Sequence, residues 1–230
     1  QSLGPYYWKR GIPLETRTTW AWHSFADSEH LTLQMAMKNY DFHGRQVPYA
    51  SLQNTPAGNY FRENPQPMPM GQISLVKHLG QPLDTTDISQ IHQTLNLWKG
   101  LITSRYLVDS VPVSVRTVAD PSAALIAFSI HSSLLKSGAL KIAIRFPYAY
   151  DVAVKNKPPI LWGHPDKNKT VRVGQNPHDV LLKRSSDTSL YYVRVHWNND
   201  ARWTRTGDND YLLDANGSDS LTFSLAFFPR

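Results

Sequence analysis

Three groups of residues combine aromatic rings with planar polar side chains, a combination suited to sugars. A pyranose ring has apolar C–H faces and a hydroxyl edge, so an aromatic face and hydrogen-bonding groups recognise it together. One group lies at residues 60–64, a second at 197–203, and a third surrounds Trp162. The predicted sugar-binding residues are Tyr60, Phe61, Arg62, Glu63, Asn64, Trp197, Asn199 and Trp203. The alternative for each group is a loop that simply packs onto the protein surface.

The carboxylates offer little sign of a catalytic pair. Glycoside hydrolysis needs two carboxyl groups about 5–10 Å apart. Nearly all of the 18 Asp and Glu residues stand beside Gly, Pro, Asn or Ser, where carboxylates form turns. Glu63 is the best exception, because it lies in an aromatic, Pro-rich stretch. Since the G-x-S-x-G and G-x-x-x-x-G-K motifs are also absent, we predict no catalytic residue and no activity for this chain alone.

Metal and cofactor sites are not predicted either. The nine histidines are dispersed without an H-x-x-x-H or H-E-x-x-H pair, and the chain has no cysteine. Oxygen atoms of residues 164–166 and 208–210 could contact Ca²⁺, but 208–210 lacks the twelve-residue loop with its terminal Glu. Turn formation is therefore the favoured role of both stretches.

Composition restricts the partners and the compartment. The net charge of +6 comes from cations scattered near expected turns, which indicates solvated loops and no nucleic-acid module. No apolar run approaches the roughly 18 residues of a membrane helix. Because the chain starts at Gln1 without Met, we expect an exported protein, periplasmic or at the cell surface, whose signal peptide is removed before Gln1.

The elements that position these residues read as strands. Apolar and polar residues alternate with a period of two, which places one face in a core and the other in water. The predicted strands are 18–25, 28–37, 71–76, 91–106 (interrupted by a turn), 111–119, 124–130, 139–146, 170–173, 179–184, 190–197 and 220–228. The fold class is therefore all-β, a large two-sheet antiparallel β-sandwich with little helix. We expect one domain over 1–230, with a packed N-terminal arm at 1–15 and a long Pro-rich loop at 45–71.

The order of motifs through residues 54–147 resembles a known domain. The motifs are N-P-Q-P-M-P-M-G-Q-I-S-L (64–75), Q-x-L-x-L-x-x-G (93–100), D-x-V-P-V (109–113), R-T-V (116–118), P-S-A-A-L-I-A-F (121–128) and S-S-L-L-K-S-G-A-L-K-I-A-I-R-F-P-Y (132–148). Together they are similar to the N-terminal β-supersandwich, galactose-mutarotase-like in fold, of bacterial glycoside hydrolases with an (α/α)6 catalytic barrel, of the α-L-fucosidase and disaccharide phosphorylase type.

This resemblance implies a non-catalytic domain for carbohydrate degradation. In such proteins the catalytic carboxylates belong to the helical barrel, so no catalytic residue transfers to this chain. The expected partners are an oligo- or polysaccharide and the helical catalytic domain of the same polypeptide. The resemblance also implies that the domain buttresses the barrel, and we expect residues 58–64 to reach its sugar pocket.

Two other functions stay open. A free-standing carbohydrate-binding module would bind a glycan without a barrel. A mutarotase-like sugar epimerase would need a histidine and a carboxylate on one concave sheet face, for which His131 and His196 are the candidates. A structural or interaction protein is a further option.

Overall fold

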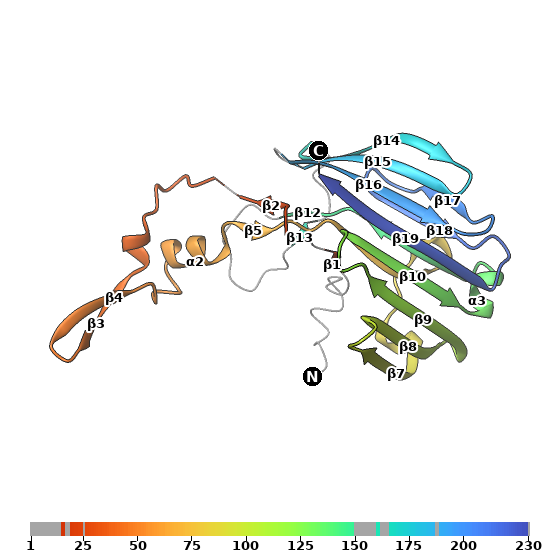
Figure 1. Cartoon of the computed structure of the whole chain (residues 1–230), viewed down its shortest axis with the longest axis horizontal. Coiled ribbons are helices and arrows are strands. Elements are labelled where there is room, and N and C mark those ends of the chain that lie inside the picture. Colours follow the sequence, from red (N-terminus) through yellow and green to blue (C-terminus); the bar gives the residue numbers. More distant parts are fainter. Residues whose placement is uncertain are drawn as a thin grey trace.

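The computed structural model describes residues 15–16, 19–24, 26–149, 160–161, 166–186 and 189–229. Two β-sheets lie face to face, and a long segment projects from one end of them (Figure 1). The predicted all-β sandwich is confirmed, and the helices are short. Of the predicted N-terminal arm, only Glu15 lies within the described residues. It belongs to β1 (Glu15–Thr16), which pairs with a strand of the sandwich.

The larger sheet has eight strands, and every neighbouring pair is antiparallel. Their order across the sheet is β14 (Asn168–Asn176), β15 (Asp179–Ser186), β16 (Ser189–Trp197), β19 (Ser220–Pro229), β10 (Leu125–His131), β9 (Val111–Ala119), β8 (Leu101–Val108) and β7 (Ile88–Asn96). The motif-rich stretch 88–131 therefore forms a four-stranded meander, as its alternation predicts.

The smaller sheet has five strands. Their order is β1, β6 (Gly71–Lys77), β11 (Leu140–Arg145), β18 (Asp210–Asp214) and β17 (Arg202–Arg205). Two-stranded ladders join β12 (Tyr148–Ala149) to β13 (Ile160–Leu161) and β2 (Trp22–His23) to β5 (Gln66–Pro67). Single turns of helix at η2 (His78–Gly80), η3 (Thr85–Asp87) and α3 (Ser133–Lys136) connect strands.

The core fills the space between the two sheets. Strand β19 shows how the sequence builds it, because its buried residues alternate with more exposed ones. The buried residues are Leu221, Phe223, Leu225 and Phe227. From the neighbouring β10, the Phe128 ring stacks on the Phe223 ring with centroids 4.9 Å apart. A period of two thus becomes one dry and one wet sheet face.

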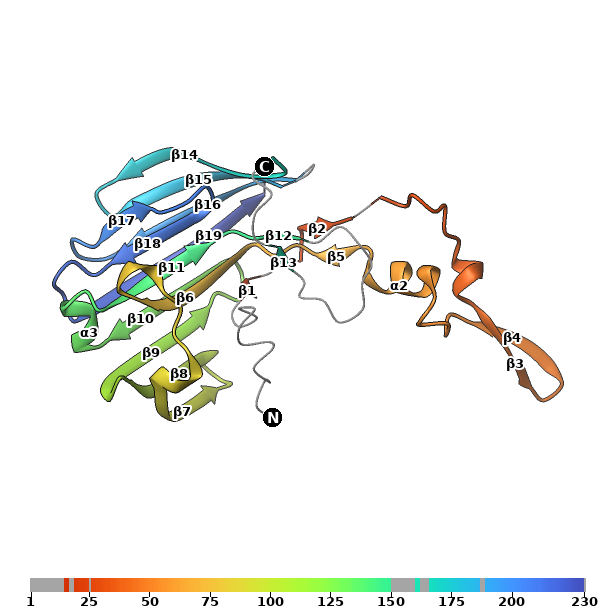
Figure 2. The ribbon, with the colours of Figure 1, turned by 180° about the vertical axis from the view of Figure 1, so that it is seen from behind.

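Residues 26–64 form the projecting segment, which leaves the sandwich as a hairpin and a helix (Figures 1 and 2). It contains η1 (Leu33–Ala36), β3 (Lys38–Phe42), β4 (Arg45–Tyr49) and α2 (Pro56–Glu63). In both views it lies at the opposite end from the turns around β17, so it forms no part of the core.

Two local predictions fail in this segment. The strand predicted at residues 28–37 is wrong, because no neighbouring strand pairs with Leu33–Ala36, and that stretch forms a 3-10 turn instead. The stretch predicted as a long loop, 45–71, contains β4, α2 and β5. Its prolines are compatible with a helix since Pro56 occupies the first turn, where no backbone donor is required. The Thr55 hydroxyl caps that helix by accepting from the Gly58 N–H at 3.0 Å.

Candidate functional site

A cleft of about 610 Å³ opens along one side of the sandwich, where the edge strands of the two sheets face each other. The β14 wall carries Asn168, Lys169, Thr170 and Arg172. The opposite wall, from β17, β18 and the turn between them, carries Trp203, Arg205, Asp208 and Tyr211. Because β14 and β17 are both edge strands, the sheets leave this side uncovered.

Aromatic rings form the apolar part of the cleft. The Trp203 ring stacks on Tyr211 with centroids 4.8 Å apart and planes at 19°. It also stacks on Trp197, with centroids 5.9 Å apart and planes at 8°. Trp197 is only 2% exposed, so it supports Trp203 from the core and is not itself a ligand surface. Of the two predicted tryptophans, Trp203 is the one that lines the cleft.

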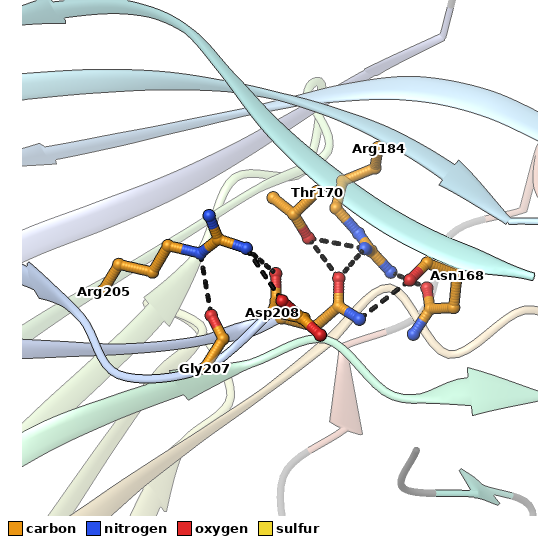
Figure 3. A network of polar contacts seen from close by, with 7 residues as sticks. Asn168, Thr170, Arg184, Arg205, Gly207 and Asp208 are labelled. Carbon is orange, nitrogen blue, oxygen red and sulfur yellow. Dashed lines mark hydrogen bonds and ion pairs between the residues drawn. The ribbon is translucent and has the colours of Figure 1, made fainter. Parts of the chain in front are cut away.

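A buried guanidinium lies behind the β14 wall (Figure 3). Arg184 is 0% exposed, and its Nη1 donates to Thr170 Oγ1 at 2.6 Å and to Asn209 Oδ1 at 2.9 Å. Its Nη2 donates to Asn168 Oδ1, and its Nε donates to the Tyr191 hydroxyl at 3.4 Å. All four acceptors are neutral, and no carboxylate of the described residues forms an ion pair with Arg184. The charge is therefore solvated by protein dipoles but not neutralised.

Aromatic faces complete the surroundings of this guanidinium. Its carbon lies 4.8 Å from the Phe146 ring centroid and 5.9 Å from that of Tyr191, within the range of cation–π attraction. Backbone groups tie the same residues to both sheets: Asn168 Nδ2 donates to the Phe146 carbonyl at 2.9 Å and Asn209 Nδ2 to the Asn168 carbonyl at 2.8 Å. The network thus fixes β14 relative to the β17–β18 turn, and with it the width of the cleft.

The cleft itself is rich in positive charge. Lys169 and Arg172 form no ion pair within the described part of the chain, although Arg172 donates to the Gln175 amide oxygen. Arg205 contacts Asp208, with Nη2 3.1 Å from Oδ1, and donates from Nε to the Gly207 carbonyl at 2.9 Å (Figure 3). Three cations therefore accompany one carboxylate along the walls.

The surroundings of the Tyr211 hydroxyl change its pKa. Burial raises the pKa of Tyr211 above its ordinary value of 10.0, against the opposing influence of the Arg205 charge, the Thr170 hydrogen bond and the Arg184 charge. Asp210 acts in the same direction as burial. Both guanidinium groups are thus close enough to act on an atom in the cleft wall, whose phenol stays protonated and able to donate at neutral pH.

The other predicted cluster lies on helix α2, in the projecting segment. The rings of Tyr60 and Phe61 meet edge to face at 5.2 Å. Arg62 Nη2 lies 3.2 Å from Glu63 Oε1 and donates to Asn59 Oδ1 at 2.8 Å. Asn64 closes the helix by donating its backbone N–H to the Tyr60 carbonyl at 2.9 Å. This cluster is adjacent in space as well as in sequence, but the fold does not bring it to the cleft (Figures 1 and 2).

Some predicted residues have structural positions. Asn199 is in the left-handed region with φ +54°, and its Nδ2 donates to the Ser220 carbonyl at 2.9 Å, as in a tight turn after β16. Trp162 and its neighbours lie outside the described residues. For 208–210, the structure engages Asp208 with Arg205, Asn209 with Arg184 and Asp210 with Arg145. Within the described ranges, no group of three His, Asp or Glu side chains is placed to hold a metal ion.

The histidines considered for an epimerase lie on the larger sheet. His131 Nδ1 is 4.0 Å from Asp219 Oδ1, and both side chains are more than half exposed. His196 is exposed and lies opposite Asp179 in the ladder, while Asp179 pairs with Arg194 at 3.3 Å. In the described part of the chain, no helix has the length and apolarity to cross a membrane.

Sequence reasoning missed most of the cleft. Strands β17 and β18 were not predicted, since they are only four and five residues long. Lys169, Arg172 and Arg184 were treated as solvated loop charges. One signal was available: Arg184 closes an alternating run, 179–184, at the parity of the buried Val180 and Leu182. That parity places Arg184 inside the sandwich.

Comparison with known proteins gives a coarse relation. No family model matches the chain, and no curated protein matches it. Among solved structures, it is similar to a protein described as a kojibiose phosphorylase from the human microbiome, at 12% identity and a TM-score of 0.43. The match covers 70% of this chain and 23% of that protein, so the chain spans less than a quarter of its length.

Proposed function

We propose that this chain is a non-catalytic β-sandwich domain of a carbohydrate-processing protein, and that the projecting segment docks onto a helical catalytic unit of the same polypeptide. The observation that supports the proposal most is the exposed apolar surface of that segment. Its exposed large apolar side chains are Leu33, Met35, Tyr40, Phe42, Tyr49 and Phe61. Among its described residues, only Ala36 and Ala57 are buried apolar side chains.

Exposed aromatic groups at this density favour a protein partner. Phe42 and Tyr49 are each 60% exposed, and the Tyr40 and Tyr49 rings meet edge to face at 6.0 Å. Rigid aromatic side chains with few rotatable bonds supply much of the energy of protein interfaces. Contiguous apolar patches on a surface commonly mark such interfaces. The hairpin of β3 and β4 holds these rings in place before a partner arrives.

Helix α2 supplies the second part of the proposal, contact with the sugar pocket of the catalytic unit. Tyr60 and Phe61 offer apolar faces, and Arg62 is held by Asn59 and Glu63 in a fixed orientation. A guanidinium fixed in this way can donate to sugar hydroxyls with little further loss of side-chain freedom. This is the role that the sequence predicts for residues 58–64, contact with the sugar pocket.

The first test is the reading frame beyond the codon for Arg230. A helical region of several hundred residues supports the proposal, and a stop codon directly after Arg230 contradicts docking within one polypeptide. In the longer protein, the double change Phe42→Ser and Tyr49→Ser is expected to lower the melting temperature of the catalytic unit. Leu97→Ser is the matched control, because Leu97 is 82% exposed and lies in the β7–β8 turn.

The sugar contact is tested separately. Tyr60→Ala with Arg62→Gln is expected to raise KM of the longer protein for its saccharide about tenfold, since the hydrogen bond from the guanidinium and the contact with a ring are lost. Arg116→Gln, which removes an exposed arginine of β9, is expected to leave KM and kcat unchanged. Unchanged kinetics in the α2 variant would refute a sugar-contacting role for this helix.

The cleft supports a second candidate function, that of a carbohydrate-binding module. The partly exposed Trp203 ring, bordered by the planar polar groups of Arg172 and Arg205, is the feature that favours it. The two functions are compatible, because the cleft and the projecting segment are separate regions (Figure 1).

A further inference from the structure

We propose that the cleft between β14 and the β17–β18 hairpin binds an acidic saccharide, with a sugar carboxylate held by Arg172 and the sugar ring placed against the exposed part of Trp203. This assigns a ligand class and two binding residues to a surface distinct from the projecting segment. It does not depend on docking to a catalytic unit.

The shape of the cleft fits a ligand of a few sugar rings. Its volume of about 610 Å³ lies within the range of roughly 300–1,000 Å³ typical of small-ligand pockets. The half-buried Trp203 ring presents apolar surface in the cleft, and the exposed Asp208 carboxylate of the same wall can accept from hydroxyl groups. A saccharide matches this alternation of apolar and polar wall better than a uniformly apolar ligand does.

The charges of the cleft select an anionic sugar over a neutral one. Arg205 is already engaged by Asp208, which leaves Lys169 and Arg172 as the cations of the walls without an ion-pair partner among the described residues. Arg172 stands beside a β-bulge, where the ladder register shifts between Arg172 and Gly174. Bulges at sheet edges re-aim side chains and recur next to binding sites.

Arg184 adds a second, independent source of positive potential. Its guanidinium is completely buried and bonds Asn168 and Thr170, both of which line the cleft. In a region of low dielectric, a charge that neutral groups solvate still attracts an anion placed a few ångströms away. Asp208 and Asp210 are the opposing acids, and each is paired with an arginine, Arg205 and Arg145.

The cleft does not suit a nucleic acid, although it is positive. Phosphate backbones are bound by extended basic tracks that follow many charges. Here the cations gather at one cleft on one side of the sandwich. The ligand is therefore expected to carry its negative charge on a compact ring, as a uronic acid does.

Calorimetric titration of the 230-residue chain tests this assignment. The probes are tetrasaccharides that contain galacturonate, mannuronate or glucuronate, each compared with its methyl-esterified form, which keeps the rings and removes the charge. Binding of at least one acid form, tenfold or more tighter than its ester, is the expected result. No binding by any of the three, or equal binding of acid and ester, overturns the proposal.

Variants locate the binding on the protein. Arg172→Gln is expected to weaken binding of the acid form about tenfold, as the loss of a charge-assisted hydrogen bond does. Trp203→Ala is expected to weaken the acid and the ester alike, because it removes the ring surface. Arg116→Gln removes the same charge from an exposed site on β9 and is expected to change nothing.

Folding does not obscure these results. The Arg172 side chain is exposed, so its variant should keep the circular dichroism and melting temperature of the parent chain. Equal weakening by Arg116→Gln and Arg172→Gln would show non-specific attraction to a basic protein and would refute the cleft. Failure here leaves the docking proposal intact, because that proposal is measured on variants of Phe42 and Tyr49.

Discussion

The sandwich and the projecting segment differ in where they place their large apolar side chains. In the sandwich, alternating apolar residues from both sheets bury one another, and even a guanidinium is enclosed. In residues 26–64, hydrogen-bonded elements form without a core, and six large apolar side chains remain exposed. A segment that leaves its rings exposed gains no hydrophobic stabilisation from them. The comparison therefore separates a pair of sheets with a core of its own from a segment whose large apolar side chains stay exposed.

The largest effect is expected from the core of the sandwich. Phe223 is 1% exposed and stacks on Phe128, so Phe223→Ala removes a buried ring and leaves a cavity. The expected loss of unfolding free energy is about 3–5 kcal/mol, measured by urea unfolding of the 230-residue chain. A loss below about 1 kcal/mol would mean that the two sheets do not pack as described.

The second effect comes from the buried guanidinium. Arg184→Met keeps an apolar stem but removes the donor to the oxygens of Asn168 and Thr170, and leaves Asn209 Oδ1 with the Thr170 hydroxyl as its donor. Buried groups without partners cost stability, so a loss of roughly 2–4 kcal/mol is expected. The same urea experiment measures it, with the exposed Arg116→Gln as the control. Equal stability of both variants would contradict the enclosed network.

A smaller, pH-dependent effect is expected from Asp214, which pairs with Lys141 at 2.6 Å and joins β18 to β11. Burial raises the pKa of Asp214, but hydrogen bonds from Lys141 and the Asn216 N–H, together with the charges of Lys141 and Arg202, hold the pKa below the ordinary 3.8. The folded chain then binds this proton less tightly than the unfolded chain. The stabilisation is complete above about pH 5 and is lost as the pH falls through the folded-state pKa.

Asp214→Asn should therefore reduce the acid sensitivity of the sandwich. Urea midpoints of the variant and the parent, measured from pH 7 to pH 3, are expected to differ most at neutral pH and to converge as the pH falls. Parallel curves across this range would show that Asp214 contributes nothing to the pH dependence.

The smallest effect on stability is expected in the projecting segment. Phe42 is 60% exposed, so Phe42→Ala should change the unfolding free energy of the 230-residue chain by less than about 0.5 kcal/mol. Urea unfolding measures it beside Phe223→Ala, a substitution of the same two residue types at a buried position. Comparable losses of unfolding free energy for the two variants would contradict the difference between the sandwich core and the projecting segment.

The accuracy of the sequence predictions follows the same division. Strands β7 to β11, β15, β16 and β19 were predicted because each has apolar residues of its own at a period of two, which a sheet face requires. The 3-10 turn at Leu33–Ala36 also alternates, but it has no neighbour to pair with, and periodicity alone does not reveal that. Strands β17 and β18 are short, and they form because β18 pairs with β11 and β17 pairs with β18.

The candidate site divides similarly. Residues 60–64 could be predicted as a cluster because they are consecutive, and Trp203 was identified by its ring. The other lining residues come from β14 on one wall and from β18 and the turn that holds Asp208 on the other. More than thirty residues of sequence separate the two walls. No local pattern predicts which edge strands of two sheets will face each other.

By itself, the sequence determined that this chain forms two antiparallel layers, since the alternation of side chains is a local property of each strand. The tertiary structure alone decided that Trp197 belongs to the core while Trp203 lines a cleft, and that the Arg184 charge lies behind its wall. The physical reason is that burial and potential depend on neighbours that are remote in sequence, and only the packing of the sheets brings those neighbours together.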